Sequence, residues 1–209
     1  MTAPDAIAPT VFVVDDDEAM RKSLAWLIGS VGLAVETYDG AAAFLAAWTA
    51  ERPGCLVLDV RMPGMSGLEL QDALARRGSM LPVIIITGHA DVPMAVRALK
   101  AGAVDFIEKP FNDQALLDRI HEAVQRSEAA FAGQARHARV LALLARLTPR
   151  ERQVAELVAA GKPNKVIAFE LDLSMKTVEV HRHNVMEKLE VAGVADLTRL
   201  FMEADAARP

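Results

Sequence analysis

The sequence predicts an α/β domain followed by a smaller all-α domain, and three observations lead to this. Through about residue 125, short apolar runs alternate with segments of helical periodicity, which is typical of parallel strands joined by helices. The runs are almost continuously apolar, so both faces of the sheet are expected to be covered. After residue 148 only helix signals occur.

The first domain is predicted to hold five strands and five helices. The runs that predict strands are Thr10–Val14, Ala34–Thr37, Cys55–Leu58, Val83–Ile86 and Val104–Ile107. In the first predicted helix, Leu24, Leu27 and Ile28 share one apolar stripe. The predicted helices are Glu18–Val31, Ala41–Ala50, Ser66–Arg77, Asp91–Ala101 and Asn112–Arg126.

A helical linker is predicted over residues 127–147, which are rich in Ala and Arg and contain no Pro. The C-terminal domain begins at Thr148, a capping residue that Pro149 and Glu151 follow at the favoured first and third helical positions. Gly161 is expected to end that helix. The further predicted helices are Asn164–Leu171, Ser174–Leu189 and Ala195–Ala204.

The composition places this chain among proteins with a full hydrophobic core. It has 209 residues, 52% of them hydrophobic, and a net charge of −5, with the acid excess in the first 126 residues. The single Cys55 lies in an apolar run, which favours a reduced core thiol and a reducing compartment. Neither a signal peptide nor an apolar run of about 18 residues is found, so we expect a cytoplasmic protein without a membrane partner.

Acidic residues recur where the predicted strands end. Asp15 and Asp16 follow the first strand, and Asp59 follows the third. Thr87 and Lys109 follow the fourth and fifth. Because the carboxyl ends of parallel strands meet at one rim, these side chains are expected to lie together.

Such a cluster has a definite chemistry. Grouped carboxylates need a cation, and oxygen ligands with open positions suit Mg²⁺. A carboxylate there can attack a phosphoryl group, while a hydroxyl and an ammonium bind the phosphoryl oxygens. Taken singly, each acid reads as a loop residue, but the set predicts an aspartyl-phosphate site. Pro110 predicts a turn that aims Lys109, which a cis Lys109–Pro110 bond would provide.

Three motifs, VVDDDE, LDVRMPGMSG and ITGHADVPMAVRALKAGAVDFIEKPF, resemble the receiver domain of two-component response regulators. The resemblance covers about residues 10–126. It implies a flavodoxin-like fold with parallel strand order 2-1-3-4-5. We therefore expect a receiver domain over 8–126, the helical linker over 127–147, and a second domain over 148–209.

The resemblance also implies roles for individual residues. It makes Asp59 the phosphoacceptor, Thr87 and Lys109 the phosphoryl-binding pair, and Phe106 the aromatic switch residue. The implied Mg²⁺ ligands are Asp15 (through water), Asp16, Asp59 and the backbone carbonyl of Arg61. Asp17 is a third acid beyond the two that the resemblance requires, and no role is assigned to it.

The segment Ser174–Leu189 decides how the second domain is interpreted. Val178, Val185 and Leu189 share one face of this helix. A short helix, a turn and a second helix with a polar outward face are typical of a helix-turn-helix, whose second helix enters the major groove. Acids slightly outnumber bases in this domain, so charge alone leaves a helical dimerisation bundle equally open.

The run LTPRERQVAELVAAGKPNKVIAFELDLSMKTVEVHRHNVMEKLEV resembles the LuxR/FixJ-type helix-turn-helix. Together with the receiver motifs, it implies a FixJ-like regulator of the NarL/FixJ class. The implied DNA-binding residues are Asn164, Lys165, Lys176, Thr177, Glu179, Val180, Arg182 and His183. Lys165, Lys176 and Arg182 are expected at phosphates. Glu179 departs from a basic surface; it would either accept a hydrogen bond from a cytosine amino group or weaken non-specific binding.

The main hypothesis is therefore a regulator rather than an enzyme. A sensor histidine kinase phosphorylates Asp59, and the resulting homodimer binds double-stranded promoter DNA, with RNA polymerase as a further partner. One alternative is a phosphatase with an aspartyl-phosphate intermediate, but Arg61 rather than an acid stands two residues after Asp59, and there is no cap insertion. The other is a regulator whose C-terminal helices dock another protein.

Overall fold

The computed structural model describes residues 8–50, 52–89 and 91–205. The chain forms two compact units that divide between Phe131 and Ala132. The predicted second domain runs to residue 209, and its last four positions lie outside the described residues. Among the described helices, none combines the length and the apolar character that crossing a membrane requires.

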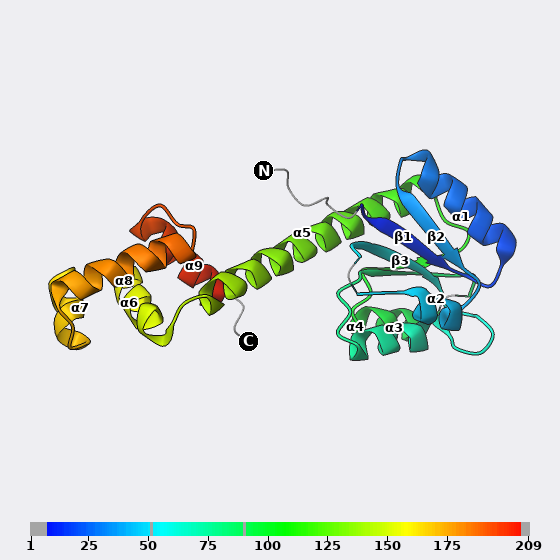
Figure 1. The fold of residues 1–209 in the computed structure, drawn as a ribbon. Helices are drawn as coiled ribbons and strands as arrows, with labels where there is room; N and C mark the ends of the chain where they lie inside the picture. Colours follow the sequence, from blue (N-terminus) through cyan, green and yellow to red (C-terminus); the bar gives the residue numbers. More distant parts are fainter. Residues whose placement is uncertain (1–7, 51, 90, 206–209) are drawn as a thin grey trace. The chain divides into compact units, whose positions relative to one another are not determined.

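The first unit is a five-stranded parallel sheet covered by helices on both faces (Figure 1). Its strands are β1 (Thr10–Val14), β2 (Ala34–Tyr38), β3 (Gly54–Asp59), β4 (Val83–Thr87) and β5 (Asp105–Glu108). They are arranged in the order β2-β1-β3-β4-β5, which confirms the predicted flavodoxin-like topology. The register places Asp59 opposite Ile86 and Val14 opposite Leu58, so the carboxyl ends of β1, β3 and β4 share one edge.

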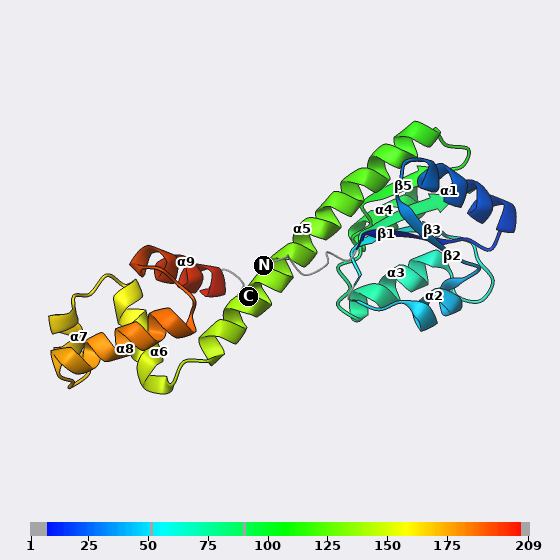
Figure 2. The same ribbon diagram turned by 45° about the horizontal axis from the view of Figure 1, so that its top comes forward.

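Two helical layers enclose this sheet, as Figures 1 and 2 show. The helices of this unit are α1 (Glu18–Ser30), α2 (Ala41–Ala47), α3 (Gly67–Arg76), α4 (Val92–Lys100) and α5 (Asp113–Ala145). Alternate strand residues face opposite layers. Val13 and Val57 pack in the core that α1 and α5 cover, whereas Val14 and Leu58 pack in the core that α2, α3 and α4 cover. Both faces are therefore buried, and the strand ends are held rigidly.

The connection from β3 to α3 is packed directly against the end of β3. A Cβ atom added to Gly67 would lie 2.1 Å from the backbone oxygen of Asp59. The backbone N–H of Gly67 donates to the oxygen of Val60 at 2.9 Å. Ser66 caps α3 in a reciprocal capping box with Glu69, as its position before the helix favours. These contacts fix the backbone of Asp59.

The second unit is all-helical. It consists of the last turns of α5 with α6 (Pro149–Ala159), α7 (Asn164–Glu170), α8 (Met175–Lys188) and α9 (Val194–Asp205). Its core includes Val140 and Leu144 from α5, together with Val154, Val178 and Val185. The capping box that the sequence predicts at Thr148 and Glu151 is present.

The main difference from the predicted elements lies in α5. A helix ending at Arg126 was expected, followed by a separate helical linker, but one helix runs from Asp113 to Ala145. No proline interrupts it, and a single Gly133 costs only about 1 kcal/mol in a helix. Helix α2 is shorter than expected because Trp48 adopts an extended backbone with ψ of 135°. The predicted linker limits, 127–147, remain a prediction.

Candidate functional site

The carboxyl edge of the sheet gathers the polar residues that end the strands. Asp15 follows β1, Asp59 ends β3, and Thr87 ends β4. These three residues are 1%, 5% and 1% exposed. Lys109 follows β5 and is partly buried. Burying carboxylates is costly unless they are paired, so their partners decide what this edge can do.

Lys109 joins two of the carboxylates. Its Nζ donates to Oδ2 of Asp15 and to Oδ1 of Asp59, each at 2.7 Å. The other oxygen of Asp59, Oδ2, accepts from the backbone N–H of Arg61 at 2.6 Å. The Lys109–Pro110 peptide bond is cis, as the sequence predicted. The structure therefore brings together Asp15, Asp59 and Lys109, although they are far apart in the sequence.

The surroundings of Asp59 and Lys109 raise the pKa of both side chains. Burial raises the pKa of the Asp59 carboxyl, and Asp15 adds to this, while Lys109 and the N–H of Arg61 only partly oppose it. Burial alone would lower the pKa of Lys109, but its hydrogen bonds to the two carboxylates outweigh burial and raise that pKa. Lys109 thus stays charged at neutral pH, and Asp59 is more basic than a carboxylate in water.

Other predicted members of the site are less closely engaged. The hydroxyl of buried Thr87 accepts from the backbone N–H of His89 at 3.3 Å. Phe106 is half-buried and packs against the core beneath α2, α3 and α4. Asp16 is exposed. Within the described residues, no hydrogen bond or ion pair joins Asp16, Thr87 or Phe106 to Asp59.

The groups at this edge that could hold the predicted Mg²⁺ are carboxylate and carbonyl oxygens. Among residues 8–50, 52–89 and 91–205, no three carboxylate, imidazole or thiol groups are grouped to hold a metal. The carboxylates of Asp15 and Asp59 lie close together, since Nζ of Lys109 is 2.7 Å from an oxygen of each. Their oxygens and the nearby carbonyl of Arg61 are the hard donors that Mg²⁺ prefers, so the chemistry of the donors fits this ion.

Asp17, which had no predicted role, caps α1. Its Oδ1 accepts from the backbone N–H groups of Ala19 at 2.8 Å and Met20 at 3.3 Å. Its own N–H donates to Oδ1 of Asp15 at 2.9 Å. An aspartate directly before a helix is a common N-cap, so the position itself was a signal for this role.

The outward face of α8 carries most of the predicted DNA-binding residues. Lys176, Glu179, Val180 and His183 are exposed, while Val178 on the opposite face is fully buried. Lys165 on α7 is also exposed. At the start of α8, Oγ of Ser174 accepts from the N–H of Thr177 at 3.1 Å. The two hydroxyls also share a hydrogen bond of 2.8 Å, so Thr177 takes part in the helix cap.

Two contacts link α7 and α8 to their surroundings in ways that spacing did not predict. Nη1 of Arg182 donates to Oδ1 of Asn164 at 2.7 Å, which joins α8 to the start of α7. Lys162 forms an ion pair of 2.6 Å with Glu170. Asn164 and Arg182, both predicted at the DNA, are thus engaged with each other, and Lys162 is neutralised.

The sequence also did not predict a partly buried ion pair in this unit. Nζ of Lys188, at the end of α8, donates to both carboxylate oxygens of Glu151 at 2.8 and 2.6 Å. Lys188, together with the N–H and hydroxyl of Thr148, lowers the pKa of Glu151 to about 2. The sequence showed the capping box of Thr148 and Glu151, but 37 residues separate Glu151 from Lys188.

Comparison with known proteins assigns each unit to a family. Residues 11–121 match the response regulator receiver domain. Residues 145–201 match the bacterial regulatory proteins of the luxR family.

Similar proteins extend over nearly the whole chain. The transcriptional regulatory protein FixJ of Rhizobium meliloti is 50% identical over 193 residues, covering 92% of this chain and 95% of that protein. FixJ of Bradyrhizobium diazoefficiens is 47% identical over 194 residues, covering 93% and 95%. The solved structure of the response regulator StyR superimposes with a TM-score of 0.89 at 47% identity, covering 94% and 99%. The chain therefore belongs to the response regulators of the NarL/FixJ class, transcriptional regulators that carry a receiver domain and a LuxR-type helix-turn-helix domain.

Proposed function

We propose that phosphorylation of Asp59 by a sensor histidine kinase controls DNA binding by this transcription factor. The observation that carries this proposal is the buried Asp59 at the end of β3, which Lys109 links to Asp15. The proposed limits are 8–126 for the receiver domain, 127–147 for the linker and 148–209 for the helix-turn-helix domain. The proposed location is the cytoplasm.

The proposed reaction is a direct phosphoryl transfer. A carboxylate oxygen of Asp59 bonds to phosphorus as the phosphorus–nitrogen bond of the kinase's phosphohistidine breaks, and the histidine leaves. Lys109, already 2.7 Å from Asp59, is placed to donate to one phosphoryl oxygen, and the hydroxyl of Thr87 to another. The raised pKa of Asp59 supports its role as a nucleophile.

Mg²⁺ is the proposed cofactor, held by Asp16, Asp59 and the carbonyl of Arg61, with Asp15 acting through water. When bound, the ion would supply positive charge that offsets the negative charge of the carboxylates and of the incoming phosphoryl group. Asp15 is 1% exposed and fixed by Lys109 and by the N–H of Asp17, so its carboxylate is oriented before any ligand arrives.

Pairing of two receiver domains is the proposed consequence of phosphorylation. Helix α4 exposes Val92, Val96 and Leu99, which are 76%, 43% and 49% accessible, and this supports a surface formed by α4 and β5. Thr87 would move toward the phosphoryl group, and Phe106 of β5 would follow. A homodimer then presents two DNA-binding domains to a two-fold promoter site, with RNA polymerase as the next partner.

The proposed DNA contacts combine exposed side chains with the partly buried Thr177 and Arg182. Lys176, Thr177, Glu179, Val180 and His183 on α8 would face the major groove. Phosphate contacts would come from Lys165, Lys176 and Arg182. Asn164 holds the guanidinium of Arg182 at 2.7 Å, which supports an ordered position for it beside the DNA backbone.

Sedimentation of the full chain tests the phosphorylation step. Beryllofluoride with Mg²⁺, a mimic of the acyl phosphate, should shift the wild type from monomer to dimer and leave Asp59→Asn unshifted. An unshifted wild type, or a full shift in Asp59→Asn, contradicts the proposal.

DNA binding is tested on a duplex enriched from random sequences by the beryllofluoride-treated protein. Changing Lys176→Gln and His183→Ala together should abolish binding while the circular dichroism stays unchanged, and binding by the wild type should weaken with salt. The exposed Lys22→Gln on α1 is the matched control and should bind as the wild type does. Undiminished binding by the double variant would favour a protein-docking role for these helices instead.

A further inference from the structure

The acids that follow β1 are held by hydrogen bonds that extend into helix α1. Asp15 lies at the end of the sheet, where its backbone N–H donates to the carbonyl of Tyr38 at 3.2 Å. Asp17 caps α1 and donates its own N–H to Oδ1 of Asp15 at 2.9 Å. Between these two fixed residues lies Asp16, whose carboxylate is a proposed direct ligand of Mg²⁺. The way in which Asp16 is held therefore decides how well the metal site is prepared.

Asp16 receives no support through its own side chain. It is exposed, and in the described part of the chain its carboxylate forms no hydrogen bond or ion pair. The direction in which this carboxylate leaves the chain is therefore set by the backbone on either side of it. The helix cap of Asp17 fixes the backbone that follows, so the peptide unit that joins Asp15 to Asp16 is the one that needs a further contact.

Arg21 of α1 supplies that contact. Its Nη1 donates to the backbone carbonyl oxygen of Asp15 at 2.8 Å. This oxygen belongs to the planar unit that joins Asp15 to Asp16, so a contact with it restrains both residues. The backbone N–H of Arg21 in turn donates to the carbonyl of Asp17 at 3.0 Å. Arg21 therefore ties the start of α1 to the end of β1, with Asp16 between them.

The charge of Arg21 has the opposite effect on a metal ion. A guanidinium near the site repels a divalent cation and so lowers its affinity. Holding the peptide unit before Asp16, in contrast, raises the affinity for Mg²⁺, because the ligand is oriented before the ion arrives. The two effects differ in sign, so the response of Mg²⁺ binding to the loss of Arg21 separates them.

We propose that Arg21 is a positioning residue for Mg²⁺, which orients Asp16 by holding the carbonyl of Asp15. This inference rests on the proposed function, since it takes Asp16 as a direct ligand of the ion. Groups that orient the ligands of a metal usually contribute about tenfold or more to its affinity. Arg21 thus strengthens the binding of a cation although it is itself a cation.

Titration of the isotope-labelled, unphosphorylated full chain with Mg²⁺, followed by the NMR shifts of the backbone amides of Asp17 and Arg61, tests the proposal. Arg21→Met keeps most of the hydrocarbon stem and loses the hydrogen bond, so it should weaken Mg²⁺ binding about tenfold. If Arg21 acted through its charge alone, Arg21→Met would instead bind Mg²⁺ about twofold more tightly. Unchanged or tighter binding by Arg21→Met overturns the proposal.

Arg21→Lys decides the matter should Arg21→Met fold poorly. Lysine keeps the charge, but its side chain is one bond shorter, so its contact with the carbonyl of Asp15 should be weaker or lost. We expect Arg21→Lys to bind Mg²⁺ more weakly than the wild type does. If that variant were the only one to fold, an affinity equal to that of the wild type would overturn the proposal.

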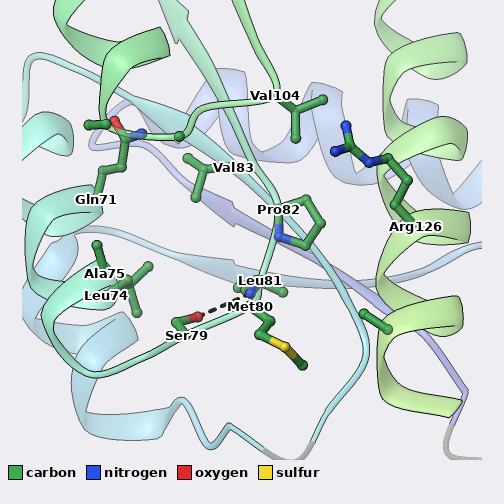
Figure 3. Close-up of a pocket in the computed structure, with 13 residues that line it drawn as sticks. Gln71, Leu74, Ala75, Ser79, Met80, Leu81, Pro82, Val83, Val104 and Arg126 are labelled. Atoms are coloured by element: carbon green, nitrogen blue, oxygen red, sulfur yellow. Dashed lines mark hydrogen bonds between the residues drawn. The ribbon is translucent and has the colours of Figure 1, made fainter. Parts of the chain in front are cut away.

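Two other substitutions by Met are the matched controls. Lys22→Met removes a charge from the next residue of α1, which pairs with Glu18 at 2.7 Å. Arg126→Met makes the same exchange at the opposite edge of the sheet, where Arg126 lines a cavity of about 340 Å³ (Figure 3). Neither should weaken Mg²⁺ binding. A tenfold loss in either control would show that the contact with Asp15 is not the cause, and it would overturn the proposal.

Phosphorylation of Asp59 by phosphoramidate, which releases ammonia, gives a second readout. The Mg²⁺ concentration for half of the maximal rate should rise about tenfold in Arg21→Met. The rate at saturating Mg²⁺ should stay near that of the wild type, because the bound ion then orients Asp16 itself. A lower rate at saturation with an unchanged half-saturating concentration would mean that Arg21 supports the fold or the phosphoryl group instead, and it would overturn the proposal.

These measurements distinguish a failure of this proposal from a failure of the proposed function. If the wild type binds Mg²⁺ but Asp59 accepts no phosphoryl group, the proposed function is wrong, and the titration still decides the role of Arg21. If the wild type is phosphorylated and Arg21→Met binds Mg²⁺ as well as the wild type does, only the role of Arg21 is wrong. A wild type that does not bind Mg²⁺ contradicts both.

Discussion

In the receiver domain the charged groups of the site are buried and bound to one another, whereas on the outer face of α8 they are exposed. Asp15 and Asp59 are at most 5% exposed, and Lys109 bridges them. The side chains of Lys176 and His183 are exposed and form no hydrogen bond or ion pair among the described residues.

This difference follows from what each surface has to do. Phosphoryl transfer gains from charges fixed in advance in a site of low dielectric constant. Binding of a DNA backbone gains from charges that are free to displace counterions. Substitutions at the buried site should therefore change the free energy of unfolding, whereas those on α8 should change affinity alone.

The largest effect is expected from Gly67→Ala. Its Cβ would lie 2.1 Å from the backbone oxygen of Asp59, so β3 or α3 must move. We expect the receiver domain to lose about 3 kcal/mol or more of its free energy of unfolding, as severe overpacking does. Urea unfolding followed by circular dichroism measures this loss, and the dimer shift with beryllofluoride should weaken in parallel.

Gly133→Ala is the matched control for that substitution. A Cβ at Gly133 has no atom within 4 Å, and the residue lies inside α5. It should stabilise the protein by about 0.5–1 kcal/mol, because alanine is the better helix former. A similar loss in both variants would show that the contact with Asp59 is not the cause.

Glu151→Gln should cause the next largest loss in the free energy of unfolding. This residue is an exception to the contrast between the two domains, because its charge is buried although it lies in the helix-turn-helix domain. Glu151 is 3% exposed and accepts two hydrogen bonds from Lys188. Removing the charge should cost about 2 kcal/mol, as is usual for hydrogen bonds to charged groups. Urea unfolding at pH 7 measures it.

The same pair predicts a pH dependence. The pKa of Glu151 is about 2 in the folded state, against 4.5 for an unperturbed glutamate. The folded state thus binds this proton less readily, so the stabilisation is complete above about pH 5 and is lost as the pH falls toward 2. The gap between the wild type and Glu151→Gln should narrow over that range. A gap that is constant from pH 7 to pH 3 would mean that packing, not charge, causes it.

Asp17→Ala should cost less, about 1 kcal/mol, the usual value for an N-cap. Asp17 stands beside the buried acids, yet its side chain accepts from Ala19 and Met20 of α1. The beryllofluoride-induced dimer shift should therefore persist. Loss of that shift in a variant that remains folded would place Asp17 in the phosphoryl site.

Lys176→Gln should have the smallest effect on stability, within about 0.5 kcal/mol, because the residue is exposed. It should still reduce the salt dependence of DNA binding by about 0.9 in the slope of log K against log salt, the value for one phosphate contact. Fluorescence anisotropy at several salt concentrations measures the slope. An unchanged slope would remove Lys176 from the phosphate contacts.

The residues that the sequence located best are those at strand ends. The position of Asp59 after an apolar run, and of Lys109 before a proline, predicted both their edge of the sheet and the cis bond. Such positions can be predicted from the sequence because every strand of a parallel sheet ends at the same edge, so residues that follow different strands lie near one another.

Contacts between helices that are distant in the sequence could not be predicted from the positions of residues in this way. Gln71 reads as an ordinary helical residue until the structure places Ala98 against its amide. Likewise, nothing in the spacing pairs Arg182 with Asn164. Such contacts depend on how helices cross, which local periodicity does not determine. The length of α5 was underestimated because a change in composition does not end a helix that lacks a breaker.

The long helix α5 has a practical consequence for exchanging domains between related regulators. Ser127 is buried and its hydroxyl accepts from the N–H of Gly54 at 3.0 Å. A junction between two parent sequences placed before Ser127 would therefore remove a contact of the receiver domain. Val140 belongs to the core of the second unit, so a junction placed after it would leave a gap in that core. Between them, residues 128–139 include no buried side chain. Chimaeric regulators with new input or output halves should be joined within this stretch.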